Sequence, residues 1–153
     1  MKSEDRYDSL FHYYSELHSF SGNDWLRFKA QVKAESNFDP NARSSVGALG
    51  LAQFMPPTWK EWSDGTPGIQ EMAKKIWLID PRDPEDAINS QVLYMKWLLR
   101  RVSTWECAFA AYNWGIGNIL KIWSNPQWKT LLPKETYEYI YRIEDYYQEY
   151  LNG

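Results

Sequence analysis

One acidic residue, Glu35, stands where the stretch AESNFDPNARSSVGALGLAQFMPPTW, residues 34–59, changes from a helical pattern to a turn-rich one. Trp25, Phe28 and Val32 precede it at helical spacing, and Glu35 lies about 20° around the helix from Phe28. Its carboxyl should project from the apolar edge, where desolvation disfavours the charged form and raises the pKa. A carboxyl that keeps its proton near neutral pH can act as a general acid. The spacing alone leaves open a solvent-exposed glutamate in a frayed last turn.

Most glycosidases pair such an acid with a second carboxylate, and the sequence offers no obvious partner for Glu35. Asp39 is four residues further on, but Pro40 disfavours helical geometry at the residue before it. We therefore expect Asp39 to be a turn residue rather than a nucleophile. Glu61 and Asp64 follow two consecutive prolines, and the pattern does not place them. One acid without an evident partner is the main mechanistic hint.

Other chemistries find little support, and we expect neither a metal nor a cofactor. His12 and His18 lack the neighbouring ligands of a metal site. The glycine-rich residues 47–53 have neither the preceding strand nor the lysine of a phosphate loop, and no serine sits in a nucleophile elbow. One acidic cluster lacks the spacing of a calcium loop and is better explained by helix capping. Its members are Asp80, Asp83, Glu85 and Asp86.

The length of 153 residues indicates one domain, residues 1–153. The composition is that of an ordinary globular protein, because 44% of the residues are hydrophobic and 24% are charged. The net charge of −3 argues against nucleic acid as a partner. The N-terminus MKSEDRYDSLFHYY does not resemble a signal peptide, and no run of about 18 apolar residues could span a membrane. Cys107 is expected to be a buried, unreactive thiol in an apolar helical run.

Helical patterns dominate, so the fold class predicted is mostly α, with one irregular segment at about 37–56. Asp83 can cap the middle helix, with Pro84 at its first position. Helices are expected at 4–19, from about Asn23, from Asp83 through Val102, at 104–112, at 116–123 and at 134–151. The inward face of the last helix is predicted to carry Tyr137, Ile140, Ile143 and Tyr147.

Four segments together resemble the soluble lytic transglycosylase family, lysozyme-like enzymes that cut the glycan strands of peptidoglycan. The first is ESNFDPNARSSVGALGLAQFMPPTW, and the others follow in the family's order. They are DPEDAINSQVLYMKWLL, AFAAYNWGIGNIL and LPKETYEYI, which extends to about residue 140. The resemblance implies a single-domain lysozyme-like fold in which the irregular segment forms part of the active site.

The resemblance also implies a set of site residues. Glu35 matches the catalytic glutamate. Ser44 matches a serine lining its pocket, and Glu135 matches a second glutamate that is substrate-positioning or structural. The substrate-binding residues implied in this way are Ser44, Gln53, Met55, Tyr112, Asn113 and Glu135. Trp59, Trp62 and Trp114 flank these segments and could stack on sugar faces.

Several positions differ from the family pattern, but the glutamate that matches the catalytic acid is not one of them. Ala52 stands where methionine is usual, and Ile116 stands where proline is usual. Ala87 and Gln91 replace an asparagine and a glycine in the middle helix. Trp114 replaces a small residue, which puts the shape of the sugar groove in question.

The reaction implied is non-hydrolytic cleavage between N-acetylmuramic acid and N-acetylglucosamine. Glu35 would serve as acid and then as base while a 1,6-anhydro ring closes. Tyr112 could hydrogen-bond either Glu35 or the substrate. The nearest alternative is a hydrolytic muramidase in which Asp39 or Asp64 activates water. A glycan-binding module without activity and a helical interaction domain are the remaining alternatives.

The expected partner is a peptidoglycan glycan strand, with no nucleic acid and no membrane insertion, bound by a monomer. The site of action would be the bacterial cell wall, on the periplasmic or extracellular side. Because no export signal is visible, we expect either a phage lytic protein made in the host cytoplasm or a trimmed form of an exported bacterial enzyme.

Overall fold

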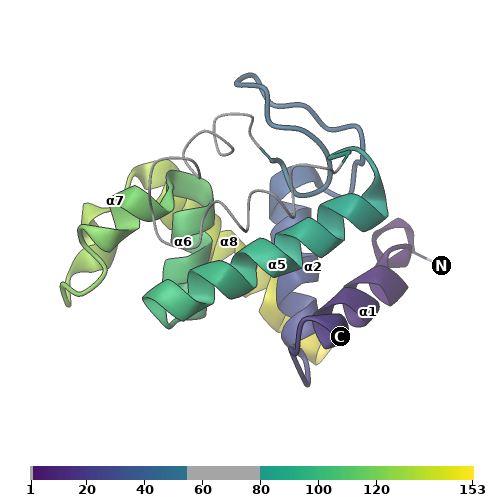
Figure 1. Cartoon of the computed structure of the whole chain (residues 1–153), viewed down its shortest axis with the longest axis horizontal. Helices are drawn as coiled ribbons and strands as arrows, with labels where there is room; N and C mark the ends of the chain where they lie inside the picture. The colour runs from purple at the N-terminus through teal and green to yellow at the C-terminus, as the bar shows by residue number, and fades with distance from the viewer. Residues whose placement is uncertain (1, 55–79) are drawn as a thin grey trace.

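The computed structural model describes residues 2–54 and 80–153, and within them the chain is helical (Figure 1). No strand forms there; two isolated β-bridges, Arg43 with Leu49 and Leu49 with Phe54, lie in the irregular segment. The elements are η1 Ser3–Asp5, α1 Asp8–Leu17, α2 Asp24–Ser36, α5 Pro84–Val102, α6 Trp105–Trp114, α7 Ile116–Leu120, η2 Trp128–Leu131 and α8 Lys134–Asn152. The mostly α prediction is confirmed, whereas the single domain over 1–153 stays a prediction.

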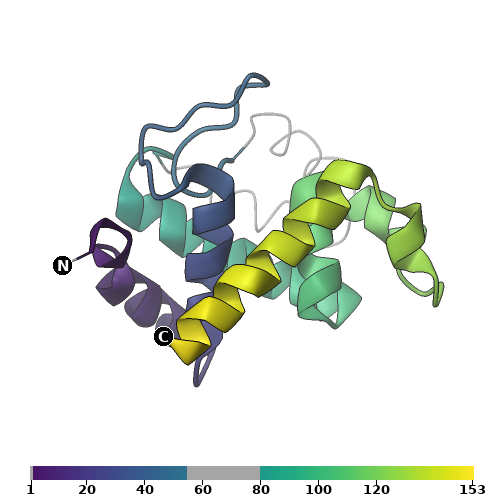
Figure 2. The ribbon, with the colours of Figure 1, turned by 180° about the vertical axis from the view of Figure 1, so that it is seen from behind.

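The long helix α5 crosses one face of the molecule, and α8 crosses the opposite face (Figures 1 and 2). Helix α2 packs against α8, α6 packs against both α5 and α8, and α1 packs against α2 and α5. The core between these helices is apolar, and its fully buried side chains include Phe28, Ile88, Met95, Leu98 and Ile143. The α2–α8 contact is the one that positions the candidate acid.

Helix α5 begins as the sequence predicts. Asp83 accepts a hydrogen bond from the backbone nitrogen of Asp86 at 3.0 Å, and Pro84 occupies the first helical position. The capping explanation of this acidic cluster is therefore confirmed at Asp83. By contrast, Asn23 precedes α2 without a side-chain capping bond, and the predicted helix 4–19 divides into η1 and α1.

The predicted inward face of α8 is wrong at one position. Tyr137 is 42% exposed and packs against the ring of Tyr141, with 4.7 Å between the centroids. Tyr139 is buried instead, because it lies four residues before Ile143 and therefore on the same helical face. The buried face consists of Thr136, Tyr139, Ile140, Ile143 and Tyr147.

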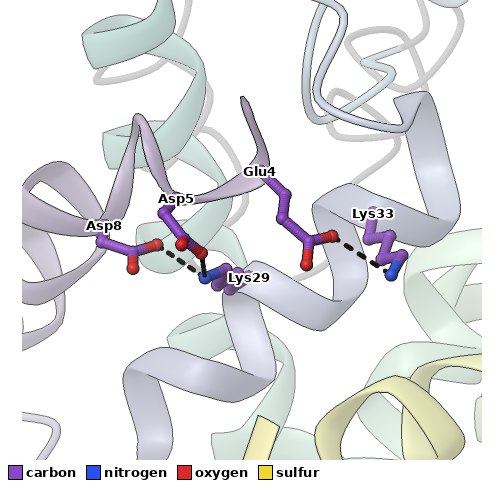
Figure 3. A network of polar contacts seen from close by, with 5 residues as sticks. All are labelled: Glu4, Asp5, Asp8, Lys29 and Lys33. Atoms are coloured by element: carbon purple, nitrogen blue, oxygen red, sulfur yellow. Dashed lines mark hydrogen bonds and ion pairs between the residues drawn. The ribbon is translucent and has the colours of Figure 1, made fainter. Parts of the chain in front are cut away.

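An N-terminal ion-pair cluster, formed by Glu4, Asp5, Asp8, Lys29 and Lys33, fastens the start of the chain to α2 (Figure 3). Lys29 is only 3% exposed and lies 2.7 Å from Asp5 and 2.9 Å from Asp8. Glu4 pairs with Lys33 at 3.2 Å. The hydrogen bond from Lys29 lowers the pKa of Asp5. The buried ammonium thus depends on acids from η1 and α1.

The double substitution Asp5→Asn with Asp8→Asn should destabilise the fold more than Lys29→Met does. The double variant leaves the Lys29 ammonium buried without an anion, and an uncompensated buried charge is strongly destabilising. Lys29→Met leaves two carboxylates that water can reach, so its cost should be smaller. Urea unfolding near neutral pH measures both. Equal losses would contradict this prediction, because they would mean that the buried ammonium costs no more without its anions than the two carboxylates cost without their cation.

Candidate active site

A cavity of about 640 Å³ opens between the end of α2, the irregular segment and α8. The structure brings together there all the predicted site residues that it describes. They are Glu35, Ser44, Gln53, Tyr112, Asn113 and Glu135. Met55 lies outside the described residues, as do Trp59, Trp62, Glu61 and Asp64. The roles of the six residues stay predictions, but their convergence from four separate stretches of sequence defines one candidate site.

Glu35 lies in the last turn of α2, and the chain turns away directly after it. Asn37 ends the helix in the left-handed region, with φ of 49°, and its backbone nitrogen donates to Lys33. The Glu35 side chain keeps partial exposure toward the cavity while protein surrounds its carboxyl. Desolvation, reinforced by the negative charge of Glu135, raises the pKa of Glu35 to about 8. The acid is therefore mostly protonated at neutral pH.

Tyr139 is the site residue that the sequence interpretation missed. Its buried hydroxyl hydrogen-bonds to the Glu35 carboxyl, and this bond partly offsets the rise in the pKa of Glu35. The same phenolic oxygen accepts a hydrogen bond from Nε2 of Gln31 at 3.1 Å. Thr136, Tyr139, Ile143 and Tyr147 recur at helical spacing, so a stricter reading of the periodicity would have identified Tyr139.

Tyr112 lines the cavity, but its hydroxyl proton is directed elsewhere. The hydroxyl donates to the backbone carbonyl of Ala52 at 2.7 Å, and the ring packs against Phe54 and Tyr94. Burial and the charge of Glu35 raise the pKa of Tyr112 well above its usual value. The hydroxyl thus donates to the backbone rather than to Glu35, and its suggested bond to a substrate stays a prediction. Tyr112 ties the irregular segment to α6.

Three predicted site residues also hold the walls of the cavity in place. Oδ1 of Asn113 accepts a hydrogen bond from the Thr136 hydroxyl at 2.8 Å, which joins α6 to α8. The Ser44 hydroxyl accepts from the backbone nitrogen of Ala48 at 3.0 Å. Nε2 of Gln53 donates to the carbonyls of Ala42 and Gly50 at 3.2 and 2.8 Å. The positions of these polar groups are thus fixed without any ligand.

The irregular segment depends on a glycine at position 50. Gly50 has φ of +80°, and a Cβ there would lie 1.7 Å from the backbone oxygen of Pro81. No other residue type could adopt this conformation and approach without displacing the backbone. The Ser36 hydroxyl also donates to the Leu51 carbonyl at 2.8 Å. These contacts hold the segment over the end of α2.

Asp39 is a turn residue, as predicted. Its side chain is exposed and accepts a hydrogen bond from the backbone nitrogen of Asn41 at 2.9 Å, and it does not line the cavity. Trp114 packs against the core and does not line this cavity either. Cys107 is buried, and burial raises its thiol pKa. Within residues 2–54 and 80–153, no three His, Cys, Asp or Glu side chains are grouped to hold a metal.

Glu35→Gln should become more stable relative to the wild type as the pH rises. The folded-state pKa is raised from 4.5 to about 8, so between these values the folded protein keeps a proton that the unfolded chain releases. This titration lowers the free energy of unfolding as pH rises through that window, and the amide removes it. Urea unfolding at about pH 4.5, 6.5 and 8.5 measures the difference. A difference that stays constant would contradict the raised pKa.

Tyr112→Phe should lower the free energy of unfolding by about 1–3 kcal/mol, because the Ala52 carbonyl loses its donor in a buried place. Backbone hydrogen exchange near Gly50 should quicken in the same variant. Tyr13→Phe is the matched control, since Tyr13 is 59% exposed. If both variants behave alike, the bond to Ala52 does not hold the segment.

Comparison with solved structures identifies the class of fold. The 70 kDa soluble lytic transglycosylase from Escherichia coli superposes with a TM-score of 0.74 at 24% identity, over 97% of this chain and 25% of that one. An inactive Glu-to-Gln mutant of lytic transglycosylase Slt from Pseudomonas aeruginosa gives 0.70 at 23% identity, with coverages of 97% and 25%. The fold is therefore that of the soluble lytic transglycosylases, the lysozyme-like fold expected from the resemblance.

Sequence comparison assigns the family. Residues 15–131 match the Transglycosylase SLT domain, and the chain belongs to that family. The membrane-bound lytic murein transglycosylase F of Shewanella denitrificans is 31% identical over 122 residues, which is 74% of this chain and 20% of that protein. Its counterpart in Shewanella pealeana is 29% identical over 122 residues, 74% of this chain and 21% of that one. The chain thus spans about a fifth of the length of these relatives.

Proposed function

We propose that the chain is a peptidoglycan lytic transglycosylase that breaks the β-1,4 bond between N-acetylmuramic acid and N-acetylglucosamine. The observation that carries this proposal is the Glu35 carboxyl, which faces a cavity of about 640 Å³ with its pKa raised to about 8. Such a group is protonated before the reaction and basic after it. Membership of the family and the names of the relatives support the same reaction.

The reaction needs one group to transfer protons in both directions. Glu35 gives its proton to the glycosidic oxygen as the bond from that oxygen to C1 of the muramic residue breaks. The 6-hydroxyl oxygen of the same residue then bonds to C1, and its proton passes to the Glu35 carboxylate. The product carries a 1,6-anhydro ring, no water is consumed, and Glu35 regains its starting state. The Tyr139 hydroxyl stabilises the carboxylate between the two transfers.

The walls of the cavity are suited to a sugar polymer. Ser44, Gln53 and Asn113 present hydroxyl and carboxamide groups there, and they are held by the hydrogen bonds described above. Groups held in place before binding lower the entropic cost of orienting a substrate. Glu135 also lines the cavity and retains its proposed substrate-binding role. Met55, which lies outside the described residues, retains the same proposed role. No cofactor takes part in the proposed reaction.

The proposed place of action is the bacterial cell wall, with a glycan strand as the partner of a monomer. Among residues 2–54 and 80–153, no helix has the length and apolar composition needed to cross a bilayer. The formal net charge is −3, so a polyanion such as nucleic acid is not proposed as a partner.

The hydrolytic muramidase is the alternative that must be tested. A hydrolase would need a group that activates water on the far side of the sugar. Asp39, one of the two aspartates suggested by the sequence, is exposed outside the cavity. Asp64, the other, lies outside the described residues. Glu135 and Glu138 also line the cavity, and they are included in the test for that reason.

Glu35→Gln should lower the rate of wall cleavage by about 100–10,000-fold, because the amide has no proton to transfer. Mass spectrometry of digested peptidoglycan should show wild-type products that end in 1,6-anhydromuramic acid and are lighter by one water than hydrolytic products. The changes Asp39→Asn, Asp64→Asn and Glu138→Gln should each reduce the rate much less. Glu135→Gln should lower the pKa of Glu35, because the charge that raises it is removed.

Reducing-end muramic acid as the main product, together with a folded but inactive Asp64→Asn or Glu135→Gln variant, would assign the chain to the hydrolases instead. An active Glu35→Gln enzyme would exclude both reactions.

A further inference from the structure

Two fully buried glutamines connect the helices behind the candidate acid. Gln31 lies on α2, one turn before Glu35 and on the same face, and Gln91 lies on α5; each is 0% exposed. Burying a carboxamide is unfavourable unless it is hydrogen-bonded. Nε2 of Gln91 donates to the Phe28 carbonyl at 3.1 Å and to Oε1 of Gln31 at 2.9 Å. Nε2 of Gln31 donates in turn to the Tyr139 hydroxyl oxygen at 3.1 Å.

The direction of these hydrogen bonds is fixed by their chemistry. The Phe28 carbonyl can only accept, so Gln91 must present its nitrogen there and to Gln31. Gln31 must therefore present its oxygen to Gln91 and its nitrogen to Tyr139. Reversing either amide would bring two acceptors or two donors together. The phenolic oxygen of Tyr139 is thereby occupied as an acceptor, and its proton is directed to Glu35.

We propose that Gln31 and Gln91 are positioning residues for Glu35, because they keep Tyr139 a donor and leave the carboxyl's own proton facing the cavity. Without the bond from Gln31, a protonated Glu35 could donate its proton to the Tyr139 oxygen instead of to a substrate. Once Glu35 is charged, the same arrangement holds the Tyr139 proton against the carboxylate. The hydrogen bonds from Gln91 to Gln31 and from Gln31 to Tyr139 stand on the geometry, whereas the effect on turnover rests on the proposed function.

Other titratable and charged groups also lie around Glu35, and substitutions at the two glutamines leave these groups in place. Helix α6 contributes Tyr112, whose proton goes to Ala52. Helix α8 contributes the acid Glu135, whose charge acts on Glu35. Three more charged residues of α8 line the same cavity, namely Lys134, Glu138 and Arg142. From α5 comes the neutral Gln91, the first member of the relay, as we call the chain of hydrogen bonds from Gln91 through Gln31 to Tyr139.

The relay also carries an energetic cost at Gln91, the residue furthest from Glu35. Oε1 of Gln91 is buried and has no hydrogen-bond partner among residues 2–54 and 80–153. A carboxamide that leaves one buried acceptor unpaired is costly to keep. The two hydrogen bonds that Gln91 Nε2 donates, to Phe28 and to Gln31, offset part of this cost.

The test measures the pKa of Glu35 directly, by ¹³C NMR titration of protein labelled at glutamate side-chain carboxyls, with Glu35→Gln to assign the signal. Gln31→Met keeps the volume and removes both polar groups. It should raise the pKa of Glu35 above about 8, because the protonated carboxyl gains Tyr139 as an acceptor and the carboxylate loses a well-polarised donor. Gln91→Met should shift it in the same direction by less.

Two further variants separate the relay from general packing. In a Tyr139→Phe background, Gln31→Met should cause no additional shift, because the hydroxyl through which it acts is gone. Ile88→Val is the packing control, since Ile88 is a fully buried apolar residue of α5. It should lower stability without moving the pKa of Glu35.

Activity gives a second readout. In Gln31→Met, kcat should fall about two- to tenfold, as expected for the loss of one neutral hydrogen bond, with KM nearly unchanged. The pH profile should shift upward with the pKa. An unchanged Glu35 pKa in folded Gln31→Met, or a shift that persists in the Tyr139→Phe background, would overturn the proposal. If the chain cleaves no peptidoglycan, the proposed function fails. The NMR titration would still test whether Gln31 acts on the pKa of Glu35 through Tyr139.

Discussion

The candidate site depends on the burial of one carboxyl at the end of a core helix. Packing α2 against α8 brings the last turn of α2 beside Tyr139 and Glu135, which act on Glu35 in opposite directions. Desolvation and the nearby negative charge favour the protonated acid, whereas the tyrosine hydroxyl favours the carboxylate. Because desolvation is the largest of these effects, the balance leaves the pKa at about 8 rather than in the usual range of a glutamate.

The irregular segment has to remain close to this carboxyl without the support of regular secondary structure. It does so through single bonds to the helices, from Ser36 to Leu51 and from Tyr112 to Ala52. Gly50 lets its backbone pass against Pro81, just before α5 begins. The wall of the cavity is therefore coupled to α2, α5 and α6, and its polar groups inherit the rigidity of those helices.

The sequence was most informative where local chemistry decides the structure. Asp83 and Pro84 predict the start of α5. The apolar stripe before Glu35 predicted its raised pKa, although the spacing alone left open an exposed glutamate and the family resemblance was needed to single it out. The choice of buried tyrosine on α8 was wrong: Tyr139 lies four residues before Ile143 on the buried face, whereas Tyr137 lies on the exposed face beside Tyr141. The bond from Tyr112 to Ala52 could not be predicted, since it joins residues sixty positions apart along the chain.

Helix α2 makes two kinds of polar interaction, each on a different face. Its faces toward η1 and α1 carry Lys29 and Lys33, whose charges are balanced by acids that water can partly reach. Its face toward α5 and α8 carries Gln31, which is neutral and satisfied by other neutral groups. A charged group in place of Gln31 would add directly to the field at Glu35, one turn away, and alter its pKa. A neutral relay can orient the hydroxyl beside the acid without such a charge, so the proton equilibrium of Glu35 remains governed by desolvation and Glu135.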